Sequence, residues 1–432
     1  MPPDRQPHFA PATIRRVLAL GWITAAAVAQ GGAQERQEPT PRLQGYPHRD
    51  DGIADTVWTR AHLTGDWGGL RTWLQARGIT PELFTTTDAS LVTAGGVDPG
   101  GTAVRTLVDA TISFASEPLL GFRGGTLFVD LQLQRGDDGS LDTGDLQRYS
   151  DIDHDHEFDE VAMLWYEQAL CDDTVFVKVG KNDTNTEFDV APHADHFLHA
   201  SFGHSPNVLA MPTYPDPAFG AQVFWQPGGF YAGAGLYDGA AQSGVRTGER
   251  GPATVFAGPD DLFGIAEAGA MWAGRHPGRL GIGLWRHTGE FQRFDGGTDD
   301  KTTGCYGVLD QSLWRVGDGD GERGVGAFAM YAWADPTVSA IEHHGGAGLA
   351  YDGPFAQRPH DVAGLGASYG AFSRAPGAGF IGGAELAVEC FYEMRLTPWL
   401  TVKPVLTWLD DPAGAPGVDD AVVLTLRTAI TF

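Results

Sequence analysis

The sequence predicts an all-β protein, an antiparallel transmembrane β-barrel of about sixteen strands with a short N-terminal amphipathic helix. From about residue 80 onward, short runs of alternating apolar and polar residues follow one another, separated by clusters of Gly, Asp and Pro. Most connections between these runs are alternately short and long, as in a barrel with turns on one rim and loops on the other. Beyond the N-terminal segment no stretch has the roughly 18 apolar residues that a transmembrane helix needs, so a membrane-spanning form must use strands.

The composition excludes several classes of protein. Hydrophobic residues make up 42% of the chain, which is enough to bury a core and excludes a disordered protein. The formal net charge of −26 argues against nucleic acid as a partner, because phosphates require Lys and Arg. Three cysteines without a CxxC pattern indicate neither a disulfide scaffold nor a zinc ribbon.

The N-terminus has the pattern of a targeting segment. Two arginines precede an apolar stretch over 17–29, which ends in a small-x-small cleavage pattern. We interpret 1–29 as a secretory signal peptide, with a short membrane anchor as the alternative. Residues 30–60 are rich in Gln, Pro and Gly and predict a flexible mature N-terminus. The barrel domain is expected over 61–432.

One stretch has helical periodicity. Within Leu63–Gly78, the spacing predicts a helix over about 66–77, with Gly78 suited to its C-terminal cap. Its apolar face consists of Trp67, Leu70, Trp73 and Leu74.

The alternation is clearest in the last run, where Leu424 and Leu426 share one face and Thr425 and Arg427 the other. Strands are expected from about residue 81, over 81–94, 103–116, 126–135, 160–170, 174–181, 218–226, 229–238, 261–272, 279–289, 305–316, 324–334, 346–353, 361–373, 383–395, 399–409 and 420–432. A soluble β-sandwich or propeller is the alternative fold. Blade-length repeats are missing from the sequence, which disfavours the propeller, and Phe432 on the apolar face fits an outer-membrane assembly signal.

Several motifs, in consistent order from residue 63 to 432, resemble those of the carbohydrate-selective porins of the OprB type. They are 63–71 (LTGDWGGLR), 164–168 (LWYEQ), 179–181 (VGK), 214–220 (YPDPAFG), 358–366 (RPHDVAGLG) and 397–404 (TPWLTVKP). The resemblance implies a sixteen-stranded outer-membrane barrel, commonly a trimer, through which sugars diffuse. Lys181 stands where Arg is frequent in that family, and the Asp/His-rich run 151–159 is unusual for it.

We therefore expect an outer-membrane porin of a Gram-negative-type bacterium that allows passive, carbohydrate-preferring diffusion of small sugars into the periplasm. Its expected partners are monosaccharides or small oligosaccharides, outer-membrane lipid and two further copies in a homotrimer, without a cofactor. The sequence contains no HExxH, and no Gly-rich phosphate loop stands after an expected strand and before a helix, so we do not expect an enzyme. The alternatives are a non-selective general diffusion porin and a secreted all-β glycan-binding protein.

A sugar channel needs polar groups for the hydroxyls and aromatic surfaces for the apolar sugar faces. Strand parity predicts that the lumen receives Trp165, Glu167, Glu385, Glu389, Glu393, Arg395, Lys403 and Arg427. The resemblance adds Lys181 and also Arg135, although parity counted from the leucines before it places Arg135 on the lipid face. The alternative is a structural role, with Glu393–Arg395 and Glu389–Lys403 as neutralising pairs in the wall.

Two loops carry the remaining candidates. The 182–217 connection contains four histidines, which either line a constriction inside the barrel or cap it against the next subunit; they are His193, His196, His199 and His204. The run 150–160 (SDIDHDHEFDE) begins like a calcium loop but lacks its Gly and its bidentate Glu. Its carboxylates and histidines suit Ca²⁺ or Zn²⁺, but a solvated acidic loop is the simpler interpretation, and we assign no metal from the sequence.

Overall fold

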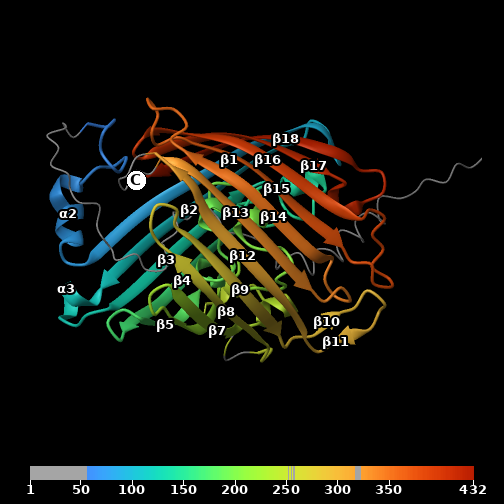
Figure 1. The fold of residues 1–432 in the computed structure, drawn as a ribbon, viewed down its shortest axis with the longest axis horizontal. Helices are drawn as coiled ribbons and strands as arrows, with labels where there is room; N and C mark the ends of the chain where they lie inside the picture. The colour runs from blue at the N-terminus through green and yellow to red at the C-terminus, as the bar shows by residue number, and fades with distance from the viewer. Residues whose placement is uncertain (1–55, 252, 254, 256–257, 317–322) are drawn as a thin grey trace, which may run out of the picture.

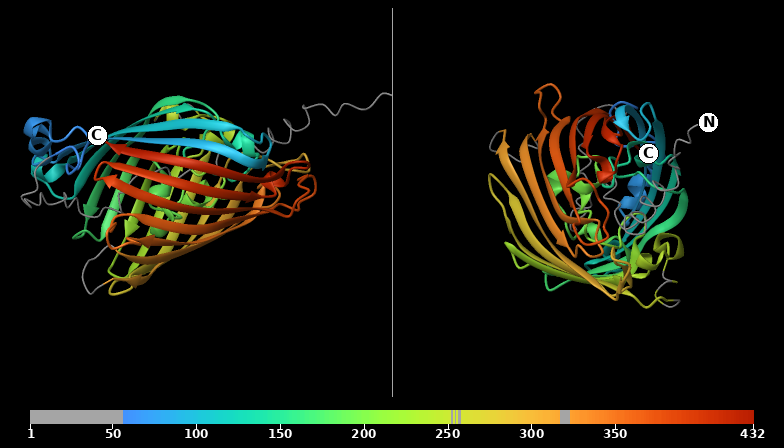
Figure 2. Two further views of the ribbon diagram at one scale, coloured as in Figure 1. Left: turned by 90° about the horizontal axis from the view of Figure 1, so that it is seen from above. Right: turned by 90° about the vertical axis from the view of Figure 1, so that its right-hand side faces the viewer.

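The computed structural model describes residues 56–251, 253, 255, 258–316 and 323–432, which form a closed antiparallel barrel of sixteen strands (Figures 1 and 2). The predicted fold class is confirmed, and each of the sixteen predicted ranges overlaps one barrel strand. The predicted signal peptide, 1–29, and most of the segment 30–60 lie outside the described residues. Within the described ranges, no helix is both long and apolar enough to cross a membrane.

The barrel strands are β1 (Ile79–Gly96), β2 (Thr102–Ala115), β3 (Gly125–Gly136), β4 (Phe158–Leu170), β5 (Val175–Asn182), β6 (Ala218–Trp225), β7 (Phe230–Asp238), β8 (Leu262–Trp272), β9 (Gly278–His287), β12 (Thr302–Arg315), β13 (Gly324–Ala334), β14 (Ile341–Asp352), β15 (Val362–Phe372), β16 (Ala384–Thr397), β17 (Leu400–Asp410) and β18 (Asp419–Thr431). A small hairpin of β10 (Phe291–Gln292) and β11 (Thr298–Asp299) lies in the loop between β9 and β12. The α-helices are α2 (Leu70–Gln75), α3 (Ser116–Leu120), α4 (Ser140–Thr143), α5 (Ala200–Gly203) and α6 (Thr247–Arg250), and the 3-10 turns are η1 (Trp67–Gly69), η2 (Thr184–Thr186), η3 (Pro192–Ala194), η4 (Ala240–Ser243) and η5 (Pro412–Gly414).

The barrel closes between its first and last strands. β1 pairs with β18 in a register that places Asp88 opposite Arg427, and every other barrel strand pairs with its neighbours in the chain. β12 pairs with β9, because the β10–β11 hairpin stands outside the barrel sheet.

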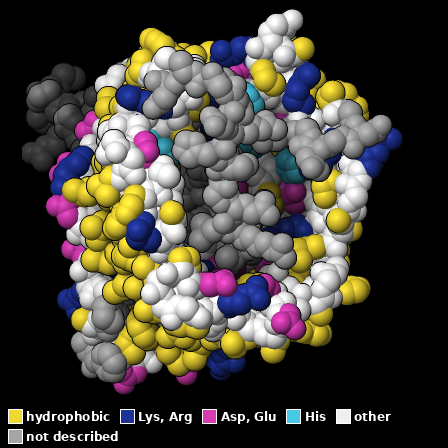
Figure 3. Space-filling view, turned by 90° about the vertical axis from the view of Figure 1, so that its left-hand side faces the viewer, with side chains coloured by type: hydrophobic (Ala, Val, Ile, Leu, Met, Phe, Trp, Pro, Cys, Tyr) yellow, Lys and Arg dark blue, Asp and Glu magenta, His cyan; other side chains and the backbone are white. Residues whose placement is uncertain are grey.

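The strands turn apolar side chains outward and polar or aromatic side chains inward. On β9, Ile282 and Leu284 are each 62% exposed, whereas Trp285 is buried. Gly283 is required between them, because a Cβ at this position would lie 2.1 Å from the ring of Tyr306 on β12. In Figure 3, hydrophobic side chains lie around the circumference of the molecule, and charged ones lie near the mouth and along the rim. An outward apolar face of this size is stable against lipid and costly in water.

The interior of the barrel is packed by two long connections. Segments of the β3–β4 and β5–β6 loops lie inside the ring of strands in the end-on view of Figure 2. Phe188, Phe197, Leu198 and Phe202 of the β5–β6 loop belong to one buried cluster with the inward Phe328, Phe391 and Val405 of the wall. The loops therefore narrow the lumen instead of leaving an open tube.

In the predicted helical stretch, the turn η1 and the helix α2 are shorter than expected from the sequence. Their buried side chain is Arg71, while Trp67, Leu70 and Trp73 are exposed. Arg71 donates to the carbonyl oxygen of Phe432 at 2.6 Å and to Glu82 at 3.1 Å, so it joins the first turn, β1 and the C-terminus.

Leu284→Arg tests which face meets lipid. A guanidinium placed on the lipid side near mid-strand is expected to reduce the free energy of unfolding by about 2–4 kcal/mol in vesicles. Denaturant midpoints in lipid vesicles measure the change. Thr298→Arg, on the exposed β11, is the matched control, and equal midpoints for the two variants would refute the assignment of this face.

Candidate pore site

Three wall carboxylates hold the β5–β6 loop across the barrel. Glu267 on β8, Asp310 on β12 and Glu389 on β16 are buried, and each accepts hydrogen bonds from backbone N–H groups of the loop. The donors are Asp189, 3.1 Å from Glu267; His193, 2.8 Å from Asp310; and Leu198 and His199, 2.9 and 2.7 Å from Glu389. The loop thus contacts widely separated parts of the wall, and its polar backbone groups are satisfied there.

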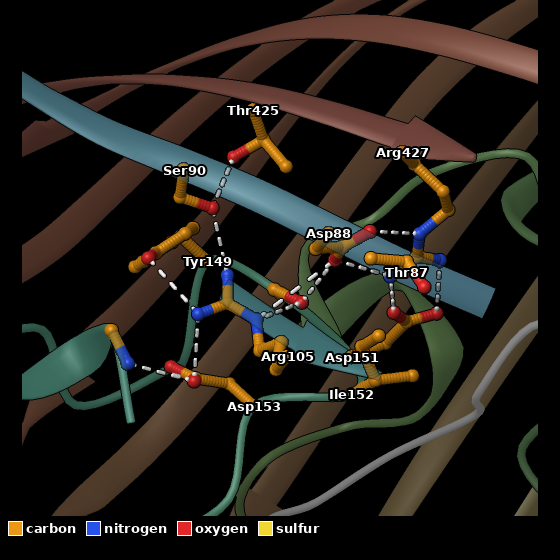
Figure 4. A network of polar contacts seen from close by, with 12 residues as sticks. Thr87, Asp88, Ser90, Arg105, Tyr149, Asp151, Ile152, Asp153, Thr425 and Arg427 are labelled. Carbon is orange, nitrogen blue, oxygen red and sulfur yellow. Dashed lines mark hydrogen bonds and ion pairs between the residues drawn. The ribbon is translucent and has the colours of Figure 1, made fainter. Parts of the chain in front are cut away.

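The β3–β4 loop is held by two buried arginines of the wall (Figure 4). Arg427 on β18 donates to Asp88 on β1 at 2.7 Å and to Asp151 of the loop at 3.1 Å. Arg105 on β2 donates to Asp153 of the loop at 2.9 Å. Because these charges are fully buried and paired, the loop position is fixed by ion pairs that water cannot replace.

These ion pairs exclude a calcium loop of the usual kind at 150–160. Asp151 and Asp153, the first carboxylates of the DxDxD pattern, are engaged by Arg427 and Arg105. Most of the run is buried against the wall, so it is not the solvated surface loop that its composition indicated.

A repeated arrangement lines the wall, in which a cation pairs with a carboxylate and lies over an aromatic ring. The Nζ of Lys403 is 2.6 Å from Glu393 and 5.1 Å from the ring centroid of Phe391. The two other examples are Arg279 with Glu267 and Tyr231, and Lys178 with Glu187 and Trp165. In each case the ring lies behind the cation and holds it in place.

The four histidines of the loop separate into two kinds. His199 and His204 are completely buried, and burial lowers their pKa to about 3 and about 4. His193 and His196 are partly exposed, with Nδ1 of His193 2.6 Å from Asp310 and Nε2 of His196 3.7 Å from Asp352. Together with Glu393 and Lys403, whose Nζ donates to the carbonyl of His196 at 2.9 Å, these groups form what we call the pore site. The loop therefore enters the barrel, but only two of its histidines reach accessible space.

Two predicted pore residues lie on the opposite part of the wall. Trp165 faces inward and is only 8% exposed, stacked on Phe128 at 5.0 Å and covered by the ammonium of Lys178 at 4.4 Å. Glu167 also faces inward, 3.7 Å from Lys178. The ring of Trp165 therefore supports Lys178 and does not present an open face to a sugar.

The structure places three further predicted residues as follows. Arg135 lies on the same outward face as Leu131 and Leu133, half-exposed and 2.5 Å from Asp159, so it does not face the lumen. Arg395 is exposed at the end of β16, with Nη2 3.3 Å from the carbonyl of Pro398. Lys181 is buried, and its Nζ donates to the carbonyl oxygens of Val161, at 2.6 Å, and Gly248.

The predicted wall pairs are also corrected. Lys403 pairs with Glu393, not with Glu389, because Glu389 lies opposite Thr407 and accepts hydrogen bonds from the loop. Glu385 likewise accepts from backbone N–H groups, those of Leu146, Gln147 and Ala413.

Sequence reasoning missed Lys178, Arg279 and Glu267. Strand parity could have found them. For example, Lys178 alternates with Val177 and Val179 along β5, which places it on the inward face. The pairing of Arg279 with Glu267 depends on the β8–β9 register, which the sequence does not specify.

Residues 80–432 match the family model described as "Carbohydrate-selective porin, OprB family". The chain belongs to this family. It is 24% identical over 418 residues to Porin B of Pseudomonas aeruginosa, covering 86% of this chain and 91% of that protein. The high-pH structure of Pseudomonas putida OprB has the same fold, with a TM-score of 0.78 at 20% identity, and covers 88% of this chain and 100% of that one. The low-pH structure gives 0.58 at 18% identity, with coverages of 87% and 100%.

The protein is therefore an outer-membrane carbohydrate porin, and the expected family, function class and location are confirmed. The secreted, soluble alternative is excluded by the family and by the transmembrane barrel. The likeness to the two Pseudomonas putida structures establishes the fold, whereas the roles of individual residues follow from the contacts described above.

Arg427→Gln is expected to weaken this porin strongly. The substitution leaves the carboxylate of Asp151 buried without its cation and that of Asp88 with only Arg105, 4.0 Å away, which costs about 3–5 kcal/mol for a broken buried ion pair. Denaturant midpoints of refolded protein measure the loss. Adding Asp151→Asn should recover part of it, because the carboxylate left without a cation is then removed; a double variant no more stable than the single one would contradict this account.

His193 is expected to make the ion selectivity depend on pH. Burial lowers its pKa, but the hydrogen bond and charge of Asp310 raise it by more, so the pKa lies above its usual value. Its positive charge is therefore fully present below about pH 6.5 and is lost as the pH rises through the raised pKa.

The lumen near Asp310 and Asp352 becomes more negative when that charge is lost. Reversal potentials in a KCl gradient should show cation preference increasing between about pH 6 and 9. His193→Gln should show the high-pH preference throughout, while His276→Ala, on an exposed turn, should follow the wild type. An unchanged profile in His193→Gln would assign the effect to another group.

Proposed function

We propose that this porin prefers sugars because its lumen presents cations and carboxylates as pairs. The observation that carries the proposal is the Lys403–Glu393 pair of the pore site, whose carboxylate is 20% exposed; the Arg279–Glu267 and Lys178–Glu187 pairs repeat the arrangement where it is largely buried. A sugar hydroxyl both donates and accepts, so it bonds to the carboxylate and to the ammonium or guanidinium of one pair. A pair with little net charge favours an uncharged polyol over an ion of the same size.

The transport step is passive diffusion. Paired charges exchange hydrogen bonds with a sugar at a small net gain, which suits a channel, because tight binding would stop the flux. The aromatic rings behind the cations keep the donors in place while a sugar passes. We include in the proposal that no catalytic step accompanies transport.

The rival is a general diffusion porin, and one observation favours it. At the pore site, Asp310 and Asp352 lie next to His193 and His196, whose positive charge depends on pH. A net negative lumen of this kind would select for cations and sort uncharged solutes by size alone.

The double variant Lys403→Met with Glu393→Gln tests the proposal. It removes one pair while leaving the net charge and the side-chain volumes nearly unchanged. In liposome swelling, glucose entry should fall about fivefold relative to a size-matched zwitterionic amino acid, which corresponds to losing about 1 kcal/mol of hydrogen bonding. Arg135→Gln is the matched control on the outward face and should swell like the wild type.

Entry rates set only by solute size, in wild type and variant alike, would establish the general diffusion porin. Heat-modifiable migration on SDS gels verifies that each variant is folded before its flux is compared.

We further propose a homotrimer in outer-membrane lipid, as the family resemblance implies. The apolar side chains around the barrel supply surface for both lipid and neighbouring copies. Chemical cross-linking of protein in native membranes, and the mass of the detergent-extracted assembly, test this proposal, and a monomeric mass in both would refute it.

A further inference from the structure

We propose that the β3–β4 loop carries a Zn²⁺ site, formed by His154, Asp155 and His156 and completed by a water molecule. These residues play no part in the pore site. Their ligand atoms all lie within 4.8 Å of one another. The proposal rests on this geometry and is independent of how sugars are selected.

The distances suit a small tetrahedral ion. Oδ1 of Asp155 lies 3.1 Å from Nδ1 of His154 and 2.7 Å from Nδ1 of His156. Ligand atoms about 2.0–2.1 Å from Zn²⁺ in a tetrahedron stand about 3.3 Å apart, so small side-chain movements would admit the ion. Three protein ligands leave the fourth position to water.

A carboxylate is also placed to support one of the ligands. Oε1 of Glu249 on α6 lies 3.5 Å from Nε2 of His156, the ring nitrogen that faces away from Asp155. Zinc-bound imidazoles commonly donate their second N–H to a carboxylate, which orients the ring and strengthens the ligand. The ring of Phe158 packs edge-on against His154 at 5.7 Å and restricts its orientation.

The donor set favours Zn²⁺ over Ca²⁺. Two imidazoles and a single carboxylate match zinc chemistry, whereas calcium requires six to eight oxygen ligands. The neighbouring carboxylates that could have supplied such oxygens, Asp151 and Asp153, are committed to Arg427 and Arg105.

The site would join three loops at one rim of the barrel. The β3–β4 loop supplies the ligands, and α6 of the β7–β8 loop supplies Glu249. The same helix is fixed to the β5–β6 loop, because Thr247 donates to the carbonyl of Asp216 at 2.9 Å and the N–H of Gly248 to its carboxylate at 3.2 Å. A bound ion would therefore strengthen the connection of the β3–β4 loop to the β7–β8 loop, and through α6 to the β5–β6 loop.

Zinc binding by the full, untagged protein tests the proposal. Chelator-washed porin in detergent is titrated with Zn²⁺ against a fluorescent zinc indicator. We expect one high-affinity Zn²⁺ per chain, weakened about 100-fold or more in His156→Asn and Asp155→Asn. Glu249→Gln should weaken it about tenfold, as outer carboxylates do, and His276→Ala should bind as the wild type.

Two further measurements guard against misleading results. Heat-modifiable migration verifies folding. The variants are made at His156 and Asp155 because these side chains are partly exposed, so both variants are expected to fold, whereas a change at the buried His154 is expected to prevent folding. Co²⁺ in place of Zn²⁺ should give the visible absorption of a four-coordinate site, lost in His156→Asn. Equal zinc affinity in wild type and His156→Asn, or displacement of Zn²⁺ by a modest excess of Ca²⁺, would overturn the proposal.

Discussion

The buried guanidinium of Arg427 is the contact on which both the barrel and its contents depend. It joins Asp88 on β1 to β18 where the barrel closes, in direct register, and it also holds Asp151 of the β3–β4 loop. Closure of the wall and placement of the loop therefore share one cation. Because all three charges are removed from water, losing the cation leaves buried carboxylates under-compensated, with only Arg105 remaining near Asp88 at 4.0 Å. This coupling makes the loop a part of the folded barrel and not a mobile lid.

Other buried carboxylates of the wall are stabilised without a cation. The chain has 55 acidic residues against 29 Lys and Arg, so many inward carboxylates have no basic partner available. Glu385 and Glu389 accept instead from backbone N–H groups of the loops, which need partners once they leave water. Each wall carboxylate of this kind satisfies several N–H groups at once, and a charged acceptor makes the stronger hydrogen bond. The acidic composition, which excluded nucleic acid, thus has a structural use inside the barrel.

The sequence was sufficient for the strands but not for the contacts between them. Period-two alternation located all sixteen strands and placed Glu389, Glu393 and Lys403 on the inward face. Which of the two acids meets Lys403 depends on register: Phe391 faces Val405 and Met394 faces Val402, which brings Glu393 to the lysine.

For Arg135, strand parity and the family resemblance gave different predictions. Strand parity placed it outward, as the structure does, while the family resemblance placed it in the pore. The sequence left the positions of the loops open, since nothing local in it indicates that Asp151 contacts an arginine 276 positions away.

The placement of the aromatic residues explains how a channel can recognise sugars without holding them. A sugar stacked on an open ring gains dispersion and loses hydration over a whole face, and each such contact slows its release. Here Trp165, Tyr231 and Phe391 are covered by the cations that they support. In the proposed mechanism, a passing sugar meets positioned charges at the Lys403–Glu393 pair and exchanges one hydrogen bond for another. On that proposal, selectivity comes from the geometry of the cation–carboxylate pair, and the ring contributes by keeping that geometry while solutes move past.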